Sequence, residues 1–260
     1  MMEMEKSSQA LTGKHAVVTG GARGIGASVT RALVAQGANV TMLGRSPKSS
    51  ADLAGGPHLH YVQANICEPG ELHLAFDAAR ARFGPVDILV NNAGQGVSAP
   101  FLKTDFTLWR SMMQVNLDGT FHCTQAALPD MLSGKWGRIV NIASTAGLIG
   151  YAYVSAYCAA KHGMIGLTRS LALEVASKGV TVNAVCPGYT ETEMLQRTID
   201  GIVAKTGRTA EEARAELSSK NPQKRMIKPE EVANAVTWLC LPGSEAVTGQ
   251  SIAIAGGEVM

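Results

Sequence analysis

The sequence predicts an α/β protein in which one doubly wound, mostly parallel sheet of seven strands carries helices on both faces. Three observations support this prediction. Short apolar runs alternate with helix-length segments along the whole chain. Most of these runs are continuous rather than alternating, which is typical of strands buried on both faces. The segments between them mostly exceed a dozen residues, enough for a right-handed crossover from one parallel strand to the next.

Seven runs have the length and composition of buried strands, and they lie at His15–Thr19, Val40–Leu43, Leu59–Val62, Val86–Val90, Ile139–Ala143, Val180–Val185 and Ser251–Ile254. Five segments have apolar residues at helical spacing, and they lie at Ile25–Gln36, Glu71–Phe83, Phe106–Leu132, Val154–Ser177 and Glu230–Leu241. The first of these places Ile25, Val29 and Leu33 on one face. Pro229 precedes the last, where the start of a helix favours proline.

The longest stretch without a strand signal is Pro187–Lys228, which is polar and has a helical pattern around Thr209–Ser219. A long excursion that follows a strand, at the carboxyl edge of such a sheet, is typical of a binding loop or cover. We therefore expect a substrate lid at about residues 187–228. No internal repeat or linker divides the chain, so residues 1–260 are expected to form a single domain.

Composition narrows the classes of function. Hydrophobic residues make up 46% and charged residues 17% of the chain, as in globular proteins. A formal net charge of +2 argues against a protein that binds nucleic acid or a membrane surface. The chain has no long uninterrupted apolar stretch and no signal-peptide pattern, so a cytoplasmic protein is expected. Five scattered cysteines without a CxxC pair predict no disulfide framework and no metal site.

A glycine-rich segment, Thr19-Gly20-Gly21-Ala22-Arg23-Gly24-Ile25-Gly26, joins the first strand to the first helix. Glycines in this context let backbone amides approach a pyrophosphate at the helix N-terminus, where the helix dipole favours negative charge. The spacing differs from GxGxxG, and the flanking strand and helix carry the interpretation. The segment predicts a dinucleotide site.

The residues after the second strand indicate which dinucleotide. An acidic residue at this place binds the ribose 2′-hydroxyl of NAD, whereas arginine accommodates the 2′-phosphate of NADP. The chain has Gly44 and Arg45 here, Lys48 lies just beyond, and Arg23 of the glycine loop is expected to reach the same phosphate. We therefore expect NADP, with NAD less favoured.

Three further residues form a catalytic pattern. Tyr157 and Lys161 lie four apart in an expected helix and hence on one face. A free tyrosine has a pKa of about 10, and a neighbouring ammonium favours the phenolate and lowers that pKa. Ser144 follows the fifth strand, at the edge of the sheet where open α/β folds bind ligands. The set predicts proton transfer beside the dinucleotide.

These residues together resemble the short-chain dehydrogenase/reductase family, over nearly the whole chain from about Leu11 to Gly257. Its glycine motif is matched by Thr19, Gly20, Gly24 and Gly26, its NNAG motif by Asn91, Asn92, Ala93 and Gly94, and its catalytic tetrad by Asn116, Ser144, Tyr157 and Lys161. The resemblance implies a Rossmann fold and NADP-dependent hydride transfer between an alcohol and a carbonyl. Asn65 stands where the family usually has an aspartate for the adenine amine.

The resemblance also implies a role for each residue. Ser144 polarises the carbonyl, Tyr157 donates the proton, Lys161 holds the nicotinamide ribose, and Asn116 anchors a water that relays protons. The cofactor-binding residues expected on this basis are Gly20, Arg23, Gly24, Ile25, Gly26, Arg45, Asn65, Ile66, Asn92, Ala93, Gly94, Tyr157, Lys161, Pro187, Gly188, Thr190 and Thr192.

The substrate is expected to be uncharged at the reacting end. The chain resembles β-ketoacyl reductases and 3-hydroxyacyl-CoA dehydrogenases, and its lid resembles that of 3-hydroxybutyrate dehydrogenases. Those last enzymes hold a free carboxylate with two cations, but the matching positions here are Ala146 and Val154. Burying a carboxylate without a partner costs roughly several kcal/mol of binding free energy. A small hydroxy acid is therefore not expected as the substrate. The expected pocket is apolar and aromatic and consists of Gln95, Val97, Leu148, Tyr151, Tyr153 and Tyr189.

A 3-oxoacyl or 3-hydroxyacyl thioester fits such a pocket. Lys135 matches one of two basic positions that bind an acyl carrier protein in the resembling reductases, but Leu173 replaces the other, so a CoA ester is favoured. Two alternatives stay open: a reductase of cyclic, aryl or steroid-like ketones, and a non-catalytic nucleotide-binding sensor. The apolar segments Phe106–Leu132, Val154–Ser177 and Val247–Ile254, together with the resemblance, predict a homotetramer.

Overall fold

The computed structural model describes residues 9–46 and 56–260. It confirms a seven-stranded sheet, and every neighbouring pair of strands is parallel, in the order β3-β2-β1-β4-β5-β6-β7. The strands are β1 His15–Thr19, β2 Asn39–Gly44, β3 Leu59–Gln63, β4 Ile88–Asn91, β5 Gly137–Ile142, β6 Val180–Pro187 and β7 Ser251–Ile254. The order reverses between β1 and β4, and open α/β sheets bind ligands at that switch point, beyond the carboxyl ends of the strands.

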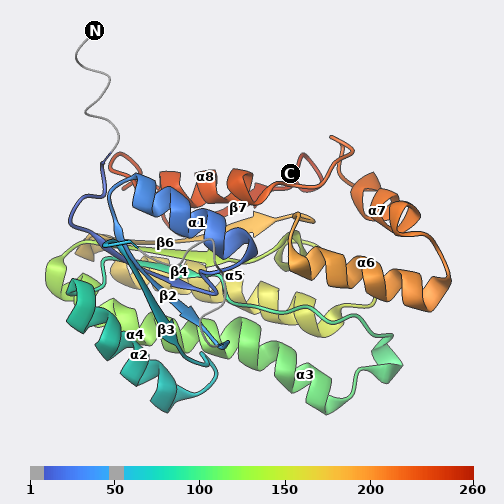
Figure 1. Cartoon of the computed structure of the whole chain (residues 1–260), viewed down its shortest axis with the longest axis horizontal. Helices are drawn as coiled ribbons and strands as arrows, with labels where there is room; N and C mark the ends of the chain where they lie inside the picture. Colours follow the sequence, from blue (N-terminus) through green and yellow to red (C-terminus); the bar gives the residue numbers. More distant parts are fainter. Residues whose placement is uncertain (1–8, 47–55) are drawn as a thin grey trace, which may run out of the picture.

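Helices cover both faces of the sheet (Figure 1). The helices α1 Gly24–Ala35 and α8 Pro229–Cys240 pack together on one face, whereas α2 Pro69–Phe83, α4 Gly119–Gly134 and α5 Ser155–Val175 lie on the other. The remaining helices are α3 Phe106–Met113, α6 Glu193–Thr206 and α7 Ala210–Ser219. Figure 1 shows α6 and α7 side by side at one end of the molecule.

One predicted helix is divided in the structure. The segment Phe106–Leu132 forms α3 and α4 with a π-helical segment, Gln114–Asp118, between them. The apolar pattern did not reveal this interruption, because a π-turn adds about one residue to a single helical turn and leaves the spacing on either side unchanged. Asn116 lies in the π segment, which makes the interruption part of the candidate site.

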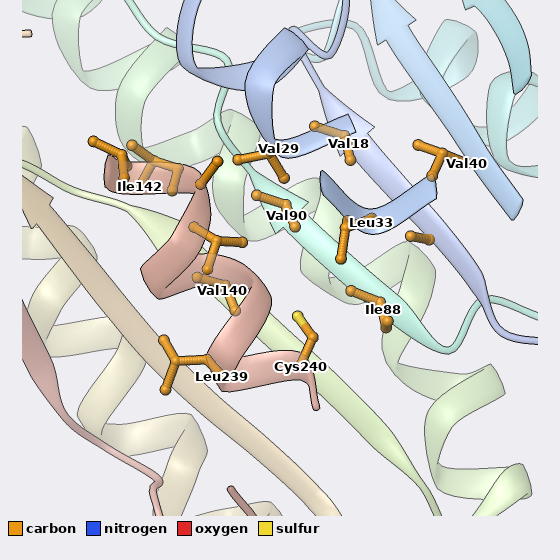
Figure 2. Packing of buried hydrophobic residues seen from close by; sticks show 14 of the residues in the cluster. Val18, Val29, Leu33, Val40, Ile88, Val90, Val140, Ile142, Leu239 and Cys240 are labelled. Carbon is orange, nitrogen blue, oxygen red and sulfur yellow. The ribbon is translucent and has the colours of Figure 1, made fainter. Parts of the chain in front are cut away.

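The first hydrophobic cluster fills the space between the sheet and the helices α1 and α8. Val18, Val90 and Val140 of three adjacent strands meet Leu33 of α1 and Leu239 of α8, and all five side chains are buried (Figure 2). Complete burial of one such side chain contributes roughly 1.5–3 kcal/mol. The cluster holds α1 against the sheet and so fixes the glycine loop that precedes this helix.

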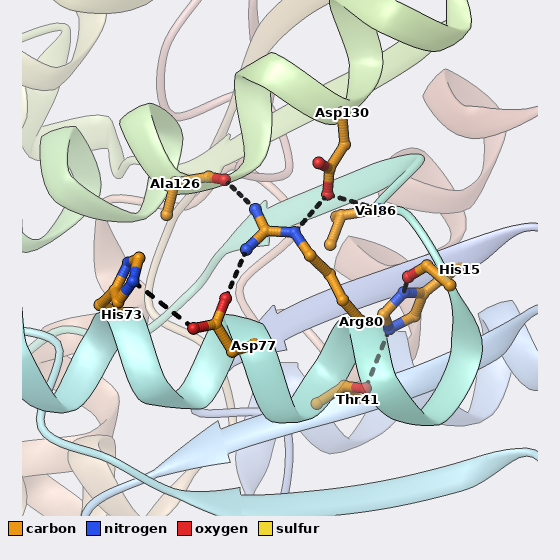
Figure 3. Close-up of polar contacts among 9 residues, drawn as sticks. His15, Thr41, His73, Asp77, Arg80, Val86, Ala126 and Asp130 are labelled. Carbon is orange, nitrogen blue, oxygen red and sulfur yellow. Dashed lines mark hydrogen bonds and ion pairs between the residues drawn. The ribbon is translucent and has the colours of Figure 1, made fainter.

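On the opposite face, Arg80 joins α2 to α4 (Figure 3). Its Nε donates to Asp130 Oδ2 at 2.8 Å, and its Nη2 donates to the carbonyl oxygen of Ala126 at 2.6 Å. Asp130 also accepts the backbone amide of Val86, at 2.9 Å, just before β4. These bonds lie at the amino edge of the sheet, away from the predicted site, and they brace the scaffold.

The predicted lid is helical and has a hydrophobic cluster of its own. The sequence pattern indicated α7, but α6 was missed although Leu195, Ile199, Ile202 and Val203 lie at helical spacing. Ile202 and Val203 are partly buried, whereas Leu195 and Ile199 are buried. These two residues pack with Ala213 of α7 and with Met226. The two ends of the excursion are held together by parallel bridging of Thr190 and Ile227.

Candidate active site

The glycine loop has a backbone that only glycines adopt easily. Gly20 and Gly24 have φ angles of +63° and +50°, in the left-handed region. A Cβ on Gly26 would lie 2.2 Å from the carbonyl oxygen of Gly20, so a side chain at Gly26 would break the turn. The loop therefore presents backbone rather than side chains at the N-terminus of α1, as a pyrophosphate site requires.

The NNAG segment ties the ends of β1 and β4 together. The backbone amides of Asn92 and Ala93 both donate to Thr19 Oγ1 at 2.9 Å. The Asn92 side chain donates to the carbonyl oxygen of Thr19 at 2.8 Å. Gly94 follows, and a Cβ there would lie 2.8 Å from Asn116 Oδ1. The segment thus fixes the glycine loop relative to Asn116.

The basic residues expected at the 2′-phosphate lie on the surface beside this loop. Arg45 is exposed directly after β2. Arg23 is exposed too, and its Nη1 lies 3.5 Å from Glu193 Oε2 of α6. Lys48 lies outside the described residues. Arg23 therefore links the glycine loop to the first turn of the lid by an ion pair that the sequence did not predict.

The residues after β3, where an adenine is expected to bind, are engaged in local contacts. Asn65 Oδ1 accepts the backbone amide of Cys67 at 3.2 Å, and the Asn65 amide donates to Glu71 Oε2 at 2.8 Å. Its carboxamide oxygen is thus engaged in a local turn, with a second lone pair left for a ligand. Ile66 is buried, and it lies so close to Gly119 that a Cβ on Gly119 would be 2.6 Å from its Cδ1.

Lys161 is buried under the carboxyl edge of the sheet, where its side chain is 3% exposed. Its Nζ donates to the carbonyl oxygen of Ile142, at the end of β5, over 2.8 Å. Burial lowers the pKa of Lys161 to about 8, and the nearby Cys186 acts in the opposite direction. The ammonium lies 5.7 Å from the centre of the Tyr157 ring, so the structure brings the two residues together as predicted.

Tyr157 differs from the expectation in the direction of its pKa shift. Burial raises the pKa of Tyr157 to about 12, and a hydrogen bond with Ser144 only partly offsets this effect. The predicted lowering by Lys161 is therefore wrong: desolvation, which disfavours the phenolate, sets the direction, and Ser144 is the group that opposes it. Ser144 caps a short 3-10 turn, and its Oγ accepts the backbone amide of Ala146 at 3.1 Å.

Asn116 holds the loop after β4 in place. It is fully buried, and its Nδ2 donates to the carbonyl oxygens of Gln95 and Met112, each at 2.9 Å. Its Oδ1 accepts the backbone amide of Gln95 at 3.2 Å. Both side-chain donors are thus engaged with the backbone, so an anchored water has only the Oδ1 acceptor of this side chain available.

A buried polar ladder that the sequence analysis missed links the helices of the site. Asn91 Nδ2 donates to Asn141 Oδ1 at 2.8 Å and to Thr124 Oγ1 of α4 at 3.1 Å. Asn141 Nδ2 donates to Thr168 Oγ1 of α5 at 2.8 Å. The only signal in the sequence was the interruption of two apolar strands by asparagine. The ladder connects β4 and β5 and positions α4 relative to α5, which carries Tyr157 and Lys161.

The end of β6 leads into the lid beside the glycine loop. The Gly188 amide donates to the carbonyl oxygen of Ile254 at 3.1 Å, and Thr190 Oγ1 donates to the carbonyl oxygen of Gly188 at 2.9 Å. Thr192 caps α6 by accepting the amide of Leu195 at 3.3 Å. Its Cγ2 lies 3.2 Å from the position of a Cβ on Gly24. The residues from Pro187 to Thr192 thus close one side of the predicted dinucleotide groove.

The predicted pocket residues divide into two groups. Val97 and Tyr153 are exposed at the rim, where the amide of Ala99 donates to the carbonyl oxygen of Tyr153. The others are engaged with the protein. Gln95 donates to Ser111 of α3, Leu148 packs against the cluster around Met164, Tyr189 packs against the lid cluster, and Tyr151 is hydrogen-bonded to Thr145 and Glu258.

Lys135 does not lie where a residue that binds an acyl carrier protein beside the site was expected. It was interpreted as one side of the cleft, but it caps α4 two residues before β5 and hence lies at the amino edge of the sheet. Leu173 lies in the last turns of α5, next to the start of β6. Within one chain, both positions are therefore separated from Tyr157 by the length of the strands. The sequence match did not predict this, because it does not show at which edge of the sheet a residue lies.

The arrangement of a glycine loop at a topological switch point, a buried Lys161 and the partly buried Ser144 and Tyr157 defines a dinucleotide-dependent enzyme site. The family model of short chain dehydrogenases matches residues 14–203. The chain belongs to the short-chain dehydrogenase family and is an oxidoreductase.

Known relatives cover almost the entire chain. A D-beta-hydroxybutyrate dehydrogenase of Cupriavidus necator is 38% identical over 96% of this chain and 99% of its own. A 3-oxoacyl-acyl-carrier-protein reductase of Aquifex aeolicus is 37% identical, with 95% and 98% covered. The solved structure of an actinorhodin polyketide ketoreductase with NADPH superimposes with a TM-score of 0.89 at 35% identity, covering 96% of this chain and 98% of that one. In the described part of the chain, no helix has the length and apolarity needed to cross a membrane.

Proposed function

We propose that this enzyme transfers a hydride between NADP(H) and a 3-oxoacyl or 3-hydroxyacyl thioester, with a CoA ester as the substrate. The observation that carries the proposal is the position of Lys161, Tyr157 and Ser144 at the carboxyl edge, beside a glycine loop that offers only backbone. The relatives named as reductases of oxoacyl groups support the reaction type, and the one solved with NADPH supports the cofactor.

The residues present fit a nicotinamide dinucleotide. Lys161 has three donor hydrogens and uses one on Ile142, which leaves two for the hydroxyls of a ribose. The loop at Gly20 and Gly24 and the N-terminus of α1 fit a pyrophosphate. Arg45 and Arg23 fit a 2′-phosphate, and Asn65 and Ile66 fit an adenine. The cofactor, when bound, supplies the hydride chemistry.

The side chains of the site supply orientation and a proton. Ser144 donates a hydrogen bond to the carbonyl oxygen of the substrate and so polarises it. Tyr157, which keeps its hydrogen at neutral pH because its pKa is about 12, donates that proton to the developing alkoxide. Lys161 holds the ribose and stabilises the phenolate left behind. Asn116 is a positioning residue for the loop at Gln95, and its role as a water anchor stays a prediction.

The cofactor preference is the first test. We expect kcat/KM with NADPH to exceed that with NADH by at least about tenfold, which corresponds to about 1.4 kcal/mol. Arg45→Asp is expected to shift the preference towards NADH, because it removes a partner of the 2′-phosphate and repels that group. Arg82→Asp, at an exposed position near the end of α2, makes the same change in net charge away from the glycine loop and serves as the control. A wild-type preference for NADH of tenfold or more contradicts the assignment of Arg45.

Cyclic or aryl ketones are the second candidate substrates. Val97 and Tyr153 form an exposed apolar rim, and the relative of known structure is a polyketide ketoreductase. We expect the highest kcat/KM for 3-oxoacyl-CoA in a panel that includes cyclic and aryl ketones and a carrier-protein thioester. A cyclic or aryl ketone as the best substrate instead identifies the second candidate. A preference for the carrier-protein thioester excludes the CoA assignment.

The excursion at residues 187–228 is proposed as a moving lid. Its cluster of Leu195, Ile199, Ala213 and Met226 is separate from the clusters of the sheet, so it can move as a unit. We expect amide hydrogen exchange in α6 and α7 to slow when cofactor and substrate are added, because closure excludes water. The helix α2 serves as the internal reference. Equal exchange with and without ligands means that the lid is a static part of the fold.

The proposed assembly is a homotetramer in the cytoplasm. Phe121 of α4, Leu173 of α5 and Trp238 of α8 are large apolar side chains that are 42%, 84% and 47% exposed. A second copy that covers these faces around two-fold axes removes them from water. Light scattering at micromolar concentration is expected to give four times the chain mass. A monomeric mass excludes the assembly.

A further inference from the structure

Glu258, near the end of the chain, lies at the edge of the candidate site. It follows β7, and its Oε2 lies 3.1 Å from the position of a Cβ on Gly188, in the turn that ends β6. Its Oε1 accepts a hydrogen bond from the Tyr151 hydroxyl at 2.6 Å. The carboxylate is therefore held by Tyr151 and lies close to the backbone of Gly188, at the edge of the sheet that carries Ser144.

Hydrogen bonds connect this carboxylate to the catalytic segment. The Tyr151 hydroxyl is also bonded to Thr145 Oγ1 at 2.9 Å, and Thr145 directly follows Ser144. Because a carboxylate can only accept, the single phenolic hydrogen of Tyr151 points to Glu258. The pKa of Tyr151 is raised mainly by burial and, second, by its bond to Glu258. The pKa of Tyr189 is also raised mainly by burial and, second, by the charge of Glu258. Two of the three tyrosines of the predicted pocket, Tyr151 and Tyr189, thus experience the negative charge.

No cation forms an ion pair with this carboxylate within 4.0 Å in the part of the chain that the structure describes. The Lys220 ammonium is exposed and lies over the Tyr151 ring, 5.0 Å from its centre, rather than against the carboxylate. Ala146, which is buried, and Val154 add no charge. Among the described residues, Glu258 is therefore a carboxylate without an ion pair, and water screens the exposed Lys220 ammonium near it.

We infer that Glu258 is a specificity-determining residue that excludes substrates with a free carboxylate and limits the site to acyl groups whose carboxyl end is uncharged, as in a thioester. The inference rests on the proposed function and names its substrate class. Like charges repel over several ångströms where water is partly excluded, whereas a thioester or a ketone carries no charge to repel.

The test compares two 3-oxo substrates that differ in one charge, acetoacetate and its neutral ethyl ester, with NADPH. In the wild type we expect kcat/KM for the ester to exceed that for the acid. Glu258→Gln keeps the size of the side chain and its bond to Tyr151, and it is expected to reduce the ester-to-acid ratio about tenfold. The change is expected in KM for acetoacetate, with KM for NADPH and kcat for the ester within about twofold. Glu258→Lys is expected to reduce the ratio further.

The control is Glu174→Gln, near the far end of α5, which makes the same change in net charge at the opposite edge of the sheet and is expected to leave the ratio unchanged. In Tyr151→Phe the Glu258 carboxylate remains. The ester-to-acid ratio of kcat/KM is therefore expected to stay above one, even if the overall rate changes. An unchanged ratio in both Glu258 variants overturns the inference.

A binding measurement separates this inference from the proposed function. Calorimetric titration of acetoacetate is expected to give at least about fivefold tighter binding to Glu258→Gln than to the wild type. If no ketone is reduced but this difference is found, the proposed function fails and the exclusion of carboxylates stands. If ketones are reduced and the affinities are equal, the exclusion fails and the proposed function stands.

Discussion

Tyr157→Phe is expected to lower turnover by about a hundredfold to ten-thousandfold, because it removes the group that donates the proton. The ring and its packing stay, so the dissociation constant for NADPH is expected to change little. The measurement is the steady-state rate of reduction together with a fluorescence titration of NADPH. A Phe variant that retains more than about a tenth of the wild-type rate shows that another group donates the proton.

The pH dependence of the wild type follows from the same hydroxyl. The pKa of Tyr157 is raised to about 12, so the protonated form needed for reduction is present at neutral pH. Alcohol oxidation requires the phenolate, and its rate is therefore expected to increase with pH, whereas the reduction rate does not. Initial rates in both directions between pH 6 and about pH 10 test this expectation. An oxidation rate that is flat with pH contradicts it.

Lys161→Met is expected to impair cofactor binding and turnover together, since this ammonium is proposed to hold the ribose and to stabilise the phenolate. The same substitution is expected to reveal a cost in stability. Burial lowers the pKa of Lys161 from 10.5 to about 8, so between these values the unfolded chain binds more protons than the folded one. The free energy of unfolding of the wild type therefore rises with pH in that window, by about 3 kcal/mol in total.

Denaturant unfolding of the cofactor-free protein at several pH values tests this cost. The difference between wild type and Lys161→Met is expected to change between about pH 8 and pH 10.5, in favour of the wild type as the pH rises, and to be constant below pH 8. Lys178→Met, on the exposed turn after α5, controls for the loss of a surface charge. A constant difference across the window contradicts the assignment of the buried ammonium.

Features of the sequence that are local to one element predicted the structure well. Val180–Val185 and His15–Thr19 form strands in the structure because continuous apolar runs must be covered on both faces. The glycine loop was predictable because strand, turn and helix are adjacent in the chain. The proximity of Tyr157 and Lys161 followed from their spacing on α5.

Features that depend on distant parts of the chain were not predictable in this way. The bond from Tyr151 to Glu258 joins residues 107 apart. The sign of the Tyr157 shift depends on how much of the protein surrounds the hydroxyl, which the neighbouring residues in the sequence do not show. The π segment contains Asn116, whose side chain bonds to the backbone of Gln95, 21 residues earlier in the chain.

The separate hydrophobic cluster of the lid bears on how the family can vary its substrates. Leu195, Ile199, Ala213 and Met226 stabilise α6 and α7 without the sheet, so a substitution on the exposed faces of these helices leaves the large clusters intact. A unit of this kind opens at a lower free energy than the whole domain. The surface proposed to cover the substrate is therefore free to diverge in evolution at little cost to folding, while Ser144, Tyr157 and Lys161, the residues proposed to perform the chemistry, lie beside a hydrophobic cluster that joins the sheet to α5.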